Sequence, residues 1–339
     1  MQAFNELTHL GQACRLRKHA VAMLERWGIH DASLRQLTEA SNIVFRVDTA
    51  DHHRFVLRMS APKSAHTPAT LLAASAWMRA LHRDGTVGVP EPIPARDGEY
   101  IHTLSVPGVP GAWHCELFSW VPGAMLEDRL SPENVWRHGA LAARLHEHAG
   151  RFVPPADARV RAYSSVFPYS DQRFPGAEPI LVLGDGDATL LPPRRLDTFR
   201  AAHDLIHAEI QSLFDRQPPR VIHNDLHVWN VKLWRDRIFA LDFEDLLLGC
   251  PIQDLATTLY YYRYREGYPT LLSAFREGYE TVRRWPEERD GQLEVLIAGR
   301  GMLLANFVLA SNDAAEREIA PGYLARAEKR MHAFLEQYG

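Results

Sequence analysis

The sequence is short of cysteine and has no surplus of one charge. Its three cysteines, Cys14, Cys115 and Cys250, are an odd number without the spacing of a zinc site, so we expect a reducing, cytoplasmic location. The net charge of −4, from 38 basic and 42 acidic residues, leaves no positive excess to neutralise a nucleic-acid backbone. We therefore expect no nucleic-acid partner.

The sequence also lacks an uninterrupted apolar run, and we expect neither secretion nor a membrane partner. The first thirty residues contain no apolar segment followed by a small-residue cleavage site. The most apolar long window, 293–310, is broken by Arg300, Asn306 and two glycines, which favours a buried core helix over a membrane span. With 46% apolar and 24% charged residues in 339, the composition is that of a globular protein with one large domain or two linked lobes. Nothing in the sequence indicates an oligomeric state.

The first 120 residues predict a small antiparallel sheet with one or two helices. Alternating and helical apolar patterns, bounded by turn residues such as Gly28, define the expected elements. They are a helix over 10–27, a hairpin of strands 43–47 and 55–59, a helix over 68–82, and strands at 100–104 and 114–121. This part is the predicted N-terminal lobe, residues 1–120, for which the family resemblance described below implies nucleotide binding.

From residue 121 onward the apolar patterns are mostly helical. One helix is expected to start at Ser131, where serine can cap, Pro132 fits the first turn and Glu133 suits the positive helix end. Another covers about 196–214, and three more are expected in the last hundred residues. A Pro/Gly/Asp-rich stretch, 154–193, predicts an irregular excursion. The α+β pattern is thus a sheet lobe followed by a helical C-terminal lobe, residues 121–339.

A polar loop followed by a predicted β-hairpin is the most informative segment. Strands 231–234 and 238–241 are expected around a turn centred on Asp236. This register places Asn230 opposite Asp242 on one face, where directly paired residues lie about 4.5–5.5 Å apart. A slip of one residue would send the two side chains to opposite faces.

An amide and a carboxylate that converge at a strand end suit Mg²⁺, which takes one or two protein oxygens and completes its shell with water and phosphate. Asp225 would lie on the loop just before, where a carboxylate could take a proton from an incoming hydroxyl while the metal holds a nucleotide phosphate. Two other interpretations stay open: a polar loop with capping aspartates, and a metal-dependent hydrolase that uses His223, Asp225 and His227 as ligands.

These residues resemble the aminoglycoside phosphotransferase and choline kinase-like family, which includes homoserine kinase-like and stress-response kinase-like members. The resemblance rests on His223-x-Asp225-x4-Asn230, with Asp242 seventeen residues after Asp225. The stretches VPEPIPARDGEY, CELFSWVPG and GCPIQDLATTLYYY also occur where that family places similar ones, so the resemblance covers most of residues 35–310. It implies a protein kinase-like two-lobed fold, with a small N-terminal lobe that holds ATP and a larger helical C-terminal lobe that carries the catalytic loop, 221–245.

The resemblance also implies roles for individual residues. Asp225 becomes the catalytic base, Asn230 and Asp242 become Mg²⁺ ligands, and Ser119 and Val121 offer backbone groups to the adenine of ATP. The implied activity is an ATP- and Mg²⁺-dependent phosphotransferase, a kinase that moves the γ-phosphoryl group to a hydroxyl of a small molecule. A protein serine/threonine kinase is an alternative because enzymes of similar fold use very different acceptors.

The same resemblance assigns supporting roles to neighbouring residues. His223 is expected to hold the loop in shape, and Asp254 to anchor the loop or cap the following helix. Glu244 and Asp245 could reach metal or substrate, or could simply be solvated.

The sequence departs from the family pattern in the N-terminal lobe. Arg58 stands where kinase-like lobes place a phosphate-binding lysine, and its planar fork does not substitute freely for an ammonium. The helical glutamate that pairs with that lysine is missing, since no acidic residue occurs between Ala61 and Arg83, and Ala74 stands near its place. Ala40, Ser41 and Asn42 replace a glycine-rich loop. These departures keep open a pseudokinase that binds nucleotide without turnover.

Overall fold

The computed structural model of the protein describes residues 3–37, 42–62, 65–185, 188–311 and 313–339. Internal contacts divide the chain into two compact units, which we call the sheet unit and the helical unit. The sheet unit consists of Met1–Gly123, Val153–Arg159 and Lys232–Glu244. The helical unit consists of Ala124–Phe152, Val160–Val231 and Asp245–Gly339. The domain boundary at residue 120 stays a prediction, and Ala40 and Ser41 lie outside the described residues.

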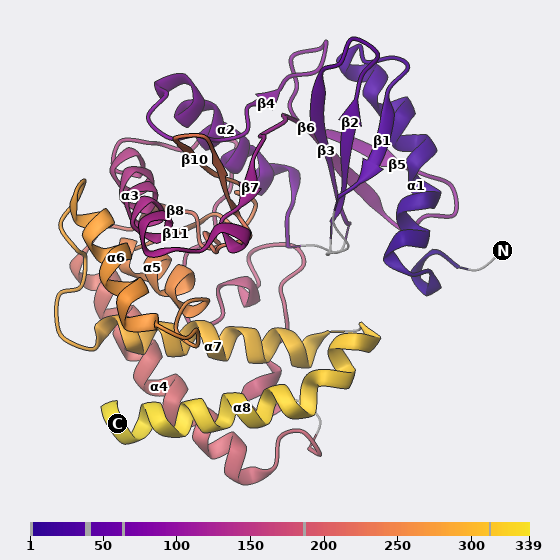
Figure 1. Cartoon of the computed structure of the whole chain (residues 1–339). Helices are drawn as coiled ribbons and strands as arrows, with labels where there is room; N and C mark the ends of the chain where they lie inside the picture. Colours follow the sequence, from indigo (N-terminus) through magenta and orange to yellow (C-terminus); the bar gives the residue numbers. More distant parts are fainter. Residues whose placement is uncertain (1–2, 38–41, 63–64, 186–187, 312) are drawn as a thin grey trace. The chain divides into compact units, whose positions relative to one another are not determined.

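A six-stranded antiparallel sheet forms the framework of the sheet unit (Figure 1). Its strand order is β1-β2-β3-β6-β4, and β5 also pairs with β6. The strands are β1 (Ser33–Gln36), β2 (Ile43–Asp48), β3 (Arg54–Ser60), β4 (Pro92–Ile93), β5 (His102–Ser105) and β6 (Ala112–Ser119). The predicted β2–β3 hairpin is confirmed, with Phe45 opposite Leu57. Strand β1 was not predicted, because four residues with one buried side chain give little alternation.

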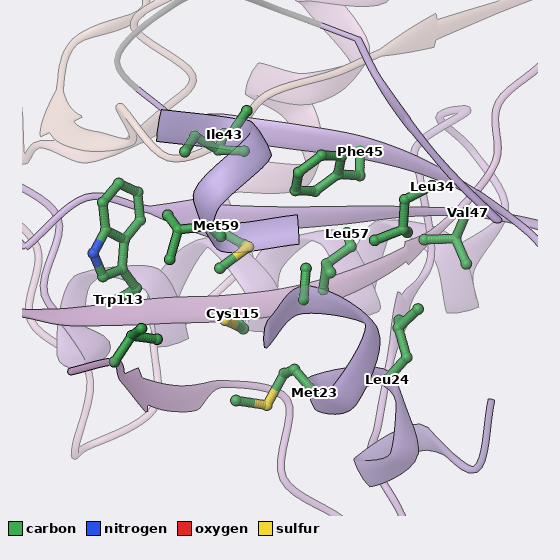
Figure 2. Packing of buried hydrophobic residues seen from close by; sticks show 14 of the residues in the cluster. Met23, Leu24, Leu34, Ile43, Phe45, Val47, Leu57, Met59, Trp113 and Cys115 are labelled. Atoms are coloured by element: carbon green, nitrogen blue, oxygen red, sulfur yellow. The ribbon is translucent and has the colours of Figure 1, made fainter. Parts of the chain in front are cut away.

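One face of this sheet is packed against α1 (His9–Leu24) (Figure 2). Met23 and Leu24 of the helix meet Phe45, Leu57 and Cys115 of the strands in one buried cluster. The predicted helix 10–27 is confirmed, and Gly28, at φ 72°, ends the short 3₁₀ turn that follows it. Side chains alternate along a strand, so the neighbours of these core residues, Arg58 and Glu116, point to the other face.

Helix α2 (Pro68–Asp84) confirms the predicted helix over 68–82. The Thr67 hydroxyl accepts a hydrogen bond from the Thr70 N–H, and Pro68 occupies the first turn. Gly85 ends the helix at φ 66°, a left-handed conformation that favours glycine.

The β-hairpin of strands β9 (Val231–Trp234) and β10 (Arg237–Ala240) is confirmed, but its predicted turn is wrong by one residue. Two residues, not three, connect the strands, and Arg235 has φ 54°. A two-residue connection puts the flanking Trp234 and Arg237 opposite each other, in place of the predicted partner Ile238. The predicted register, which placed Asn230 opposite Asp242, is therefore wrong, because every pairing in the hairpin shifts by one residue. Strand β10 ends before Asp242, which has φ 58° and therefore lies beyond the strand ladder.

The helical unit is built from six helices among its described residues. They are α3 (Pro132–Ala149), α4 (Pro193–Arg216), α5 (Pro251–Tyr260), α6 (Tyr268–Glu280), α7 (Gln292–Ala310) and α8 (Ala314–Tyr338). Ser131 caps α3 as predicted. Helices α3 and α6 approach closely where a side chain on Gly139 would collide with the backbone of Phe275. The described part of the last hundred residues holds four helices rather than the predicted three. Helix α5 has only ten residues, so its apolar pattern is too short to stand out in the sequence.

Helix α7 is the apolar window that was predicted to be a core helix. It is long and apolar enough to cross a membrane, yet 67% of its most apolar window is buried inside the protein. Its polar residues Arg300 and Asn306 are buried. The Asn306 side-chain oxygen accepts hydrogen bonds from the N–H groups of Leu181 and Val182. The predicted core helix is confirmed.

The excursion over 154–193 is irregular, as predicted. Its described part contains two single turns, Pro168–Ser170 and Leu181–Asp185. After α4, the short strands β8 (Arg220–Ile222) and β11 (Leu247–Gly249) pair antiparallel and frame the segment that carries the predicted site.

Candidate active site

The loop that follows β8 is fixed by one buried carboxylate. Asp254, in the first turn of α5, accepts hydrogen bonds from the backbone N–H groups of His223 and Asn224, at 3.1 and 2.6 Å. His146 Nε2 of α3 lies 2.9 Å from the same carboxylate. Burial by itself would raise the pKa of Asp254, but these donors hold it below its usual value. The prediction that Asp254 anchors the loop is confirmed.

The anchored loop turns sharply at Asn224, whose φ of 62° is left-handed. Asparagine tolerates this conformation better than most residues. His223 is fully buried, and its Nδ1 accepts a hydrogen bond from the Asp225 N–H at 3.3 Å. His223 thus shapes the loop that presents Asp225, as expected from the resemblance.

Asp225 is surrounded by donors. Its Oδ2 accepts a hydrogen bond from Asn230 Nδ2 at 2.8 Å and lies 3.3 Å from His227 Nε2. Its Oδ1 accepts one from Arg300 Nη2 at 2.9 Å. Burial acts to raise the pKa of Asp225, but His227 and Arg300 lower it below the usual value. Asp225 is therefore ionised and fixed in orientation, as a proton acceptor must be, although the lowered pKa makes it a weak base.

Asn230 is the second predicted residue that the helical unit places here. Its amide nitrogen is the atom held by Asp225, through both the backbone oxygen and the carboxylate. The amide oxygen is therefore the atom left to coordinate a cation, which is the role that the sequence predicts.

Arg300 and Tyr261 belong to this cluster although the sequence did not reveal them. Arg300 is 7% exposed, and its Nη2 also donates to the Tyr261 hydroxyl at 3.1 Å. The Tyr261 phenol and the Asp225 carboxylate raise the pKa of Arg300 against the effect of burial, so it stays charged. The signal was present: an arginine inside the most apolar window needs a buried partner, and that partner is the predicted base.

The excursion contributes one side chain to the same region of the helical unit. Tyr169 donates its hydroxyl hydrogen to Asp245 Oδ1 at 2.7 Å and accepts a hydrogen bond from Asn224 Nδ2 at 3.1 Å. Burial and the neighbouring Asp245 carboxylate raise the pKa of Tyr169 well above its usual range. The sequence left the role of Asp245 open. In the structure, Tyr169 links Asp245 to Asn224, the residue next to Asp225.

In the sheet unit, three carboxylates surround Arg58. Glu116 Oε2 accepts from Arg58 Nη2 at 2.7 Å, Asp242 Oδ1 accepts from Nη1 at 3.1 Å, and Glu244 Oε2 lies 3.2 Å from Nη1. Burial acts to lower the pKa of Arg58, but the three carboxylates raise it. Asn42 donates its amide hydrogen to Glu244 at 2.6 Å. Glu116 was not anticipated, because its pairing with Arg58 depends on the β3–β6 register.

The predicted adenine contacts lie at and just beyond the end of β6. The Ser119 N–H donates to the Glu91 carbonyl at 2.9 Å, and the Val121 carbonyl accepts from Lys232 Nζ at 2.9 Å. Lys232 also lies 4.5 Å from the centre of the Trp120 ring. These groups are already used within the sheet unit, although a carbonyl oxygen can accept a second hydrogen bond. Their contact with adenine stays a prediction.

The residues of the sheet unit fit a divalent cation. Asp242 presents a carboxylate that is 44% exposed and lies on the same Arg58 guanidinium as Glu116 and Glu244, with His66 Nε2 3.8 Å from Glu244. Mg²⁺ needs few protein ligands when phosphates supply the rest. The corrected hairpin register no longer supports the pairing of Asn230 with Asp242, and their shared role as metal ligands stays a prediction from the resemblance.

The metal-dependent hydrolase is not supported. Among the described residues, no group of three or more His, Cys, Asp or Glu side chains is arranged to hold a metal ion. His227 Nε2 and Asp225 face each other directly, and His223 Nδ1 faces a backbone N–H. The three proposed ligands therefore serve the loop itself.

An antiparallel-sheet unit, a helical unit, and an anchored His-x-Asp-x4-Asn loop together define a phosphotransferase of kinase-like fold. The chain belongs to the phosphotransferase enzyme family, whose model matches residues 33–290. This confirms the predicted family, the predicted fold and the predicted enzyme class. The third interpretation, a hydrolase, is wrong.

Solved structures of similar fold cover almost the whole chain. A microcompartment-associated aminopropanol kinase is 22% identical, with a TM-score of 0.77 over 95% of this chain and 98% of its own. An amicoumacin kinase in complex with AMP-PNP and Ca²⁺ is 18% identical, with a TM-score of 0.71 over 94% and 93%. A spectinomycin phosphotransferase in complex with ADP is 15% identical, with a TM-score of 0.57 over 93% and 97%. No curated protein is similar enough in sequence to count as a match.

Proposed function

We propose that this protein is an ATP- and Mg²⁺-dependent kinase that transfers the γ-phosphoryl group to a hydroxyl of a small molecule. The observation that carries the proposal is the setting of Asp225. An ionised carboxylate is fixed by Asn230, His227 and Arg300 on a loop that is itself fixed by Asp254. Family membership supports phosphoryl transfer, and the similar kinases named above act on small molecules.

In this proposal Asp225 accepts the proton of the acceptor hydroxyl as its oxygen attacks the γ-phosphorus and ADP leaves. Phosphoryl transfer asks the protein mainly for positioning and charge neutralisation, and the base contributes about 10²–10⁴-fold. A divalent cation held by Asn230 and Asp242 would neutralise the phosphate charge. Arg58 would bind the phosphates, and the backbone of Ser119 and Val121 would bind adenine.

The acceptor is proposed to bind beside Asp225 in the helical unit. Tyr169 of the irregular excursion lies next to this loop, because its hydroxyl is hydrogen-bonded to Asn224 and Asp245. Asn224 is fully buried, and its side-chain oxygen has no hydrogen-bond partner among the described residues. A buried acceptor atom of this kind is expected to find a donor, and a hydroxyl-bearing ligand would supply one.

The test is an ATP-consumption screen over hydroxyl-bearing metabolites and antibiotics, with Asp225→Asn as control. We expect ADP release that depends on one class of acceptor and is lost in the variant. Nucleotide-dependent stabilisation with no turnover on any acceptor would favour the pseudokinase. Phosphate incorporated into serine or threonine of an added protein, with none on small molecules, would favour the protein kinase.

A further inference from the structure

The partner of Arg58 is the unusual feature of the sheet unit. No acidic residue occurs between Ala61 and Arg83, so α2 has no acidic side chain before its last residue, Asp84. Ala74, near the expected place of that glutamate, is fully buried and carries only a methyl group. The carboxylate that holds Arg58 therefore comes from elsewhere in the sheet unit.

Glu116 supplies it from the neighbouring strand. Arg58 of β3 and Glu116 of β6 are direct partners in the antiparallel register, so their side chains leave the same face at adjacent points. Arg58 Nη2 donates to Glu116 Oε2 at 2.7 Å. The guanidinium also lies over the Phe118 ring, two residues further along β6, at 5.2 Å from its centre.

The pair is buried, which makes each partner dependent on the other. Glu116 is 2% exposed and Arg58 is 6% exposed. An isolated charge at such a position would be expensive, so the two charges must be paired. Only one Nη of Arg58 is used by Glu116; the other is directed to Asp242 and Glu244, the loop after β10.

The hydrogen bonding of the pair is incomplete. Among the described residues, Arg58 Nε and Glu116 Oε1 are buried without a hydrogen-bond partner. Buried polar atoms are rarely left unsatisfied in a finished site. Because Glu116 fixes one side of the guanidinium, the fork of Arg58 is held in a defined orientation, which bidentate binding of an anion such as a phosphate requires.

We propose that Glu116 is a positioning residue that holds Arg58 for the nucleotide phosphates, in place of the helical glutamate that this chain lacks. The inference rests on the proposed use of ATP. Both members of the pair stand on one sheet, so the arginine is fixed by strand pairing within the sheet unit.

The test measures the affinity of the protein for Mg²⁺·AMP-PNP and for adenosine, without an acceptor. Glu116→Gln keeps the shape but loses the charge that fixes Arg58. We expect its AMP-PNP affinity to fall at least about tenfold, the size of one charge-assisted hydrogen bond. Adenosine has no phosphate, so its affinity should stay within about twofold. The AMP-PNP affinity of Glu116→Asp should lie between those of the wild type and Glu116→Gln.

A double-mutant cycle separates positioning from a general structural role. In an Arg58→Met background, adding Glu116→Gln should change the AMP-PNP affinity no further, because Glu116 would act only through Arg58. Glu99→Gln, an exposed glutamate of the same unit, is the matched control and should bind like the wild type. If Glu116→Gln alone fails to fold, Arg58→Met/Glu116→Leu keeps the site apolar and should still bind adenosine but lose the preference for AMP-PNP.

Three results would overturn the inference while leaving the proposed function intact. They are wild-type AMP-PNP affinity in Glu116→Gln, an equal loss for adenosine and AMP-PNP, and an undiminished effect of Glu116→Gln in the Arg58→Met background. A wild-type protein that binds no AMP-PNP at all would instead overturn the proposed function, and this inference with it.

Discussion

The two charged clusters of the molecule are built with opposite polarity. Around Asp225 in the helical unit, one carboxylate is surrounded by the donors of Asn230, His227 and Arg300. Around Arg58 in the sheet unit, one guanidinium is surrounded by three carboxylates. The first arrangement satisfies a negative charge and keeps it ionised, whereas the second gathers carboxylates on one guanidinium and leaves one of them, Asp242, 44% exposed.

This difference matches two separate tasks. An ionised carboxylate that its neighbours fix in orientation can accept a proton from a hydroxyl placed beside it. An exposed carboxylate within a group of carboxylates, such as that of Asp242, is suited to ligate a divalent cation. In the proposed function, the helical unit supplies the proton acceptor and the sheet unit binds the nucleotide.

The largest expected effect is that of Asp225→Asn. Loss of the proton acceptor should lower turnover about 10²–10⁴-fold, as expected for a general base. The amide keeps the size of the carboxylate but removes the ionic partner of the buried Arg300, so the melting temperature should also fall. Steady-state ADP release and a thermal melt measure both quantities, and a variant with wild-type turnover would show that the base is wrongly assigned.

Asp254→Asn should have the next largest effect, on stability. The carboxylate accepts from two backbone N–H groups and lies against His146, so its loss should cost about 3 kcal/mol of unfolding free energy. Denaturant titration at neutral pH measures this cost.

The pH dependence of that cost has a definite sign. The folded-state pKa of Asp254 is held below its ordinary value of 3.8, so its stabilising contribution is complete above that pH. The contribution is lost as the pH falls through the lower folded-state pKa. The stability difference between wild type and Asp254→Asn should therefore be constant near neutrality and shrink below about pH 3.8. A difference that grows on acidification would contradict this account.

Arg300→Gln tests whether the donors around Asp225 matter for turnover. Removing the guanidinium takes a charge-assisted hydrogen bond from the base, and turnover should fall roughly tenfold with unchanged AMP-PNP affinity. Arg300→Lys keeps the charge and should recover part of the loss. If both variants lose nucleotide affinity instead, the division of tasks between the clusters is wrong.

Asn224 gives the smallest effect and the finest comparison. Asn224→Gly removes the hydrogen bond to Tyr169 but fits φ 62°, whereas Asn224→Ala removes the same bond and strains the backbone. The alanine variant should be less stable than the glycine variant by about 1 kcal/mol. Equal stability of the two variants would show that the left-handed turn is not maintained in solution.

The sequence predicted what depends on local patterns. Helix ends at Ser131 and Gly85, the β2–β3 hairpin and the His-x-Asp-x4-Asn loop each follow from residues close together in the chain. The hairpin at β9 and β10 was shifted because a polar run of three residues does not reveal whether two or three form the turn.

Residues far apart in the chain were missed. Glu116 meets Arg58 only through the pairing of β3 with β6, and Arg300 meets Asp225 only through the placement of α7. A short sequence pattern encodes neither the pairing of β3 with β6 nor the placement of α7. In both cases the sequence held a weaker signal, namely a charge within an otherwise apolar segment, which needs a partner.

The most direct test of the division of tasks is one titration of Mg²⁺·AMP-PNP into Asp225→Asn and Asp242→Asn, side by side with the wild type. We predict that Asp225→Asn binds the nucleotide within about twofold of the wild type, and that Asp242→Asn binds it at least about tenfold more weakly. Equal affinities of the two variants, or a greater loss in Asp225→Asn, would contradict the account.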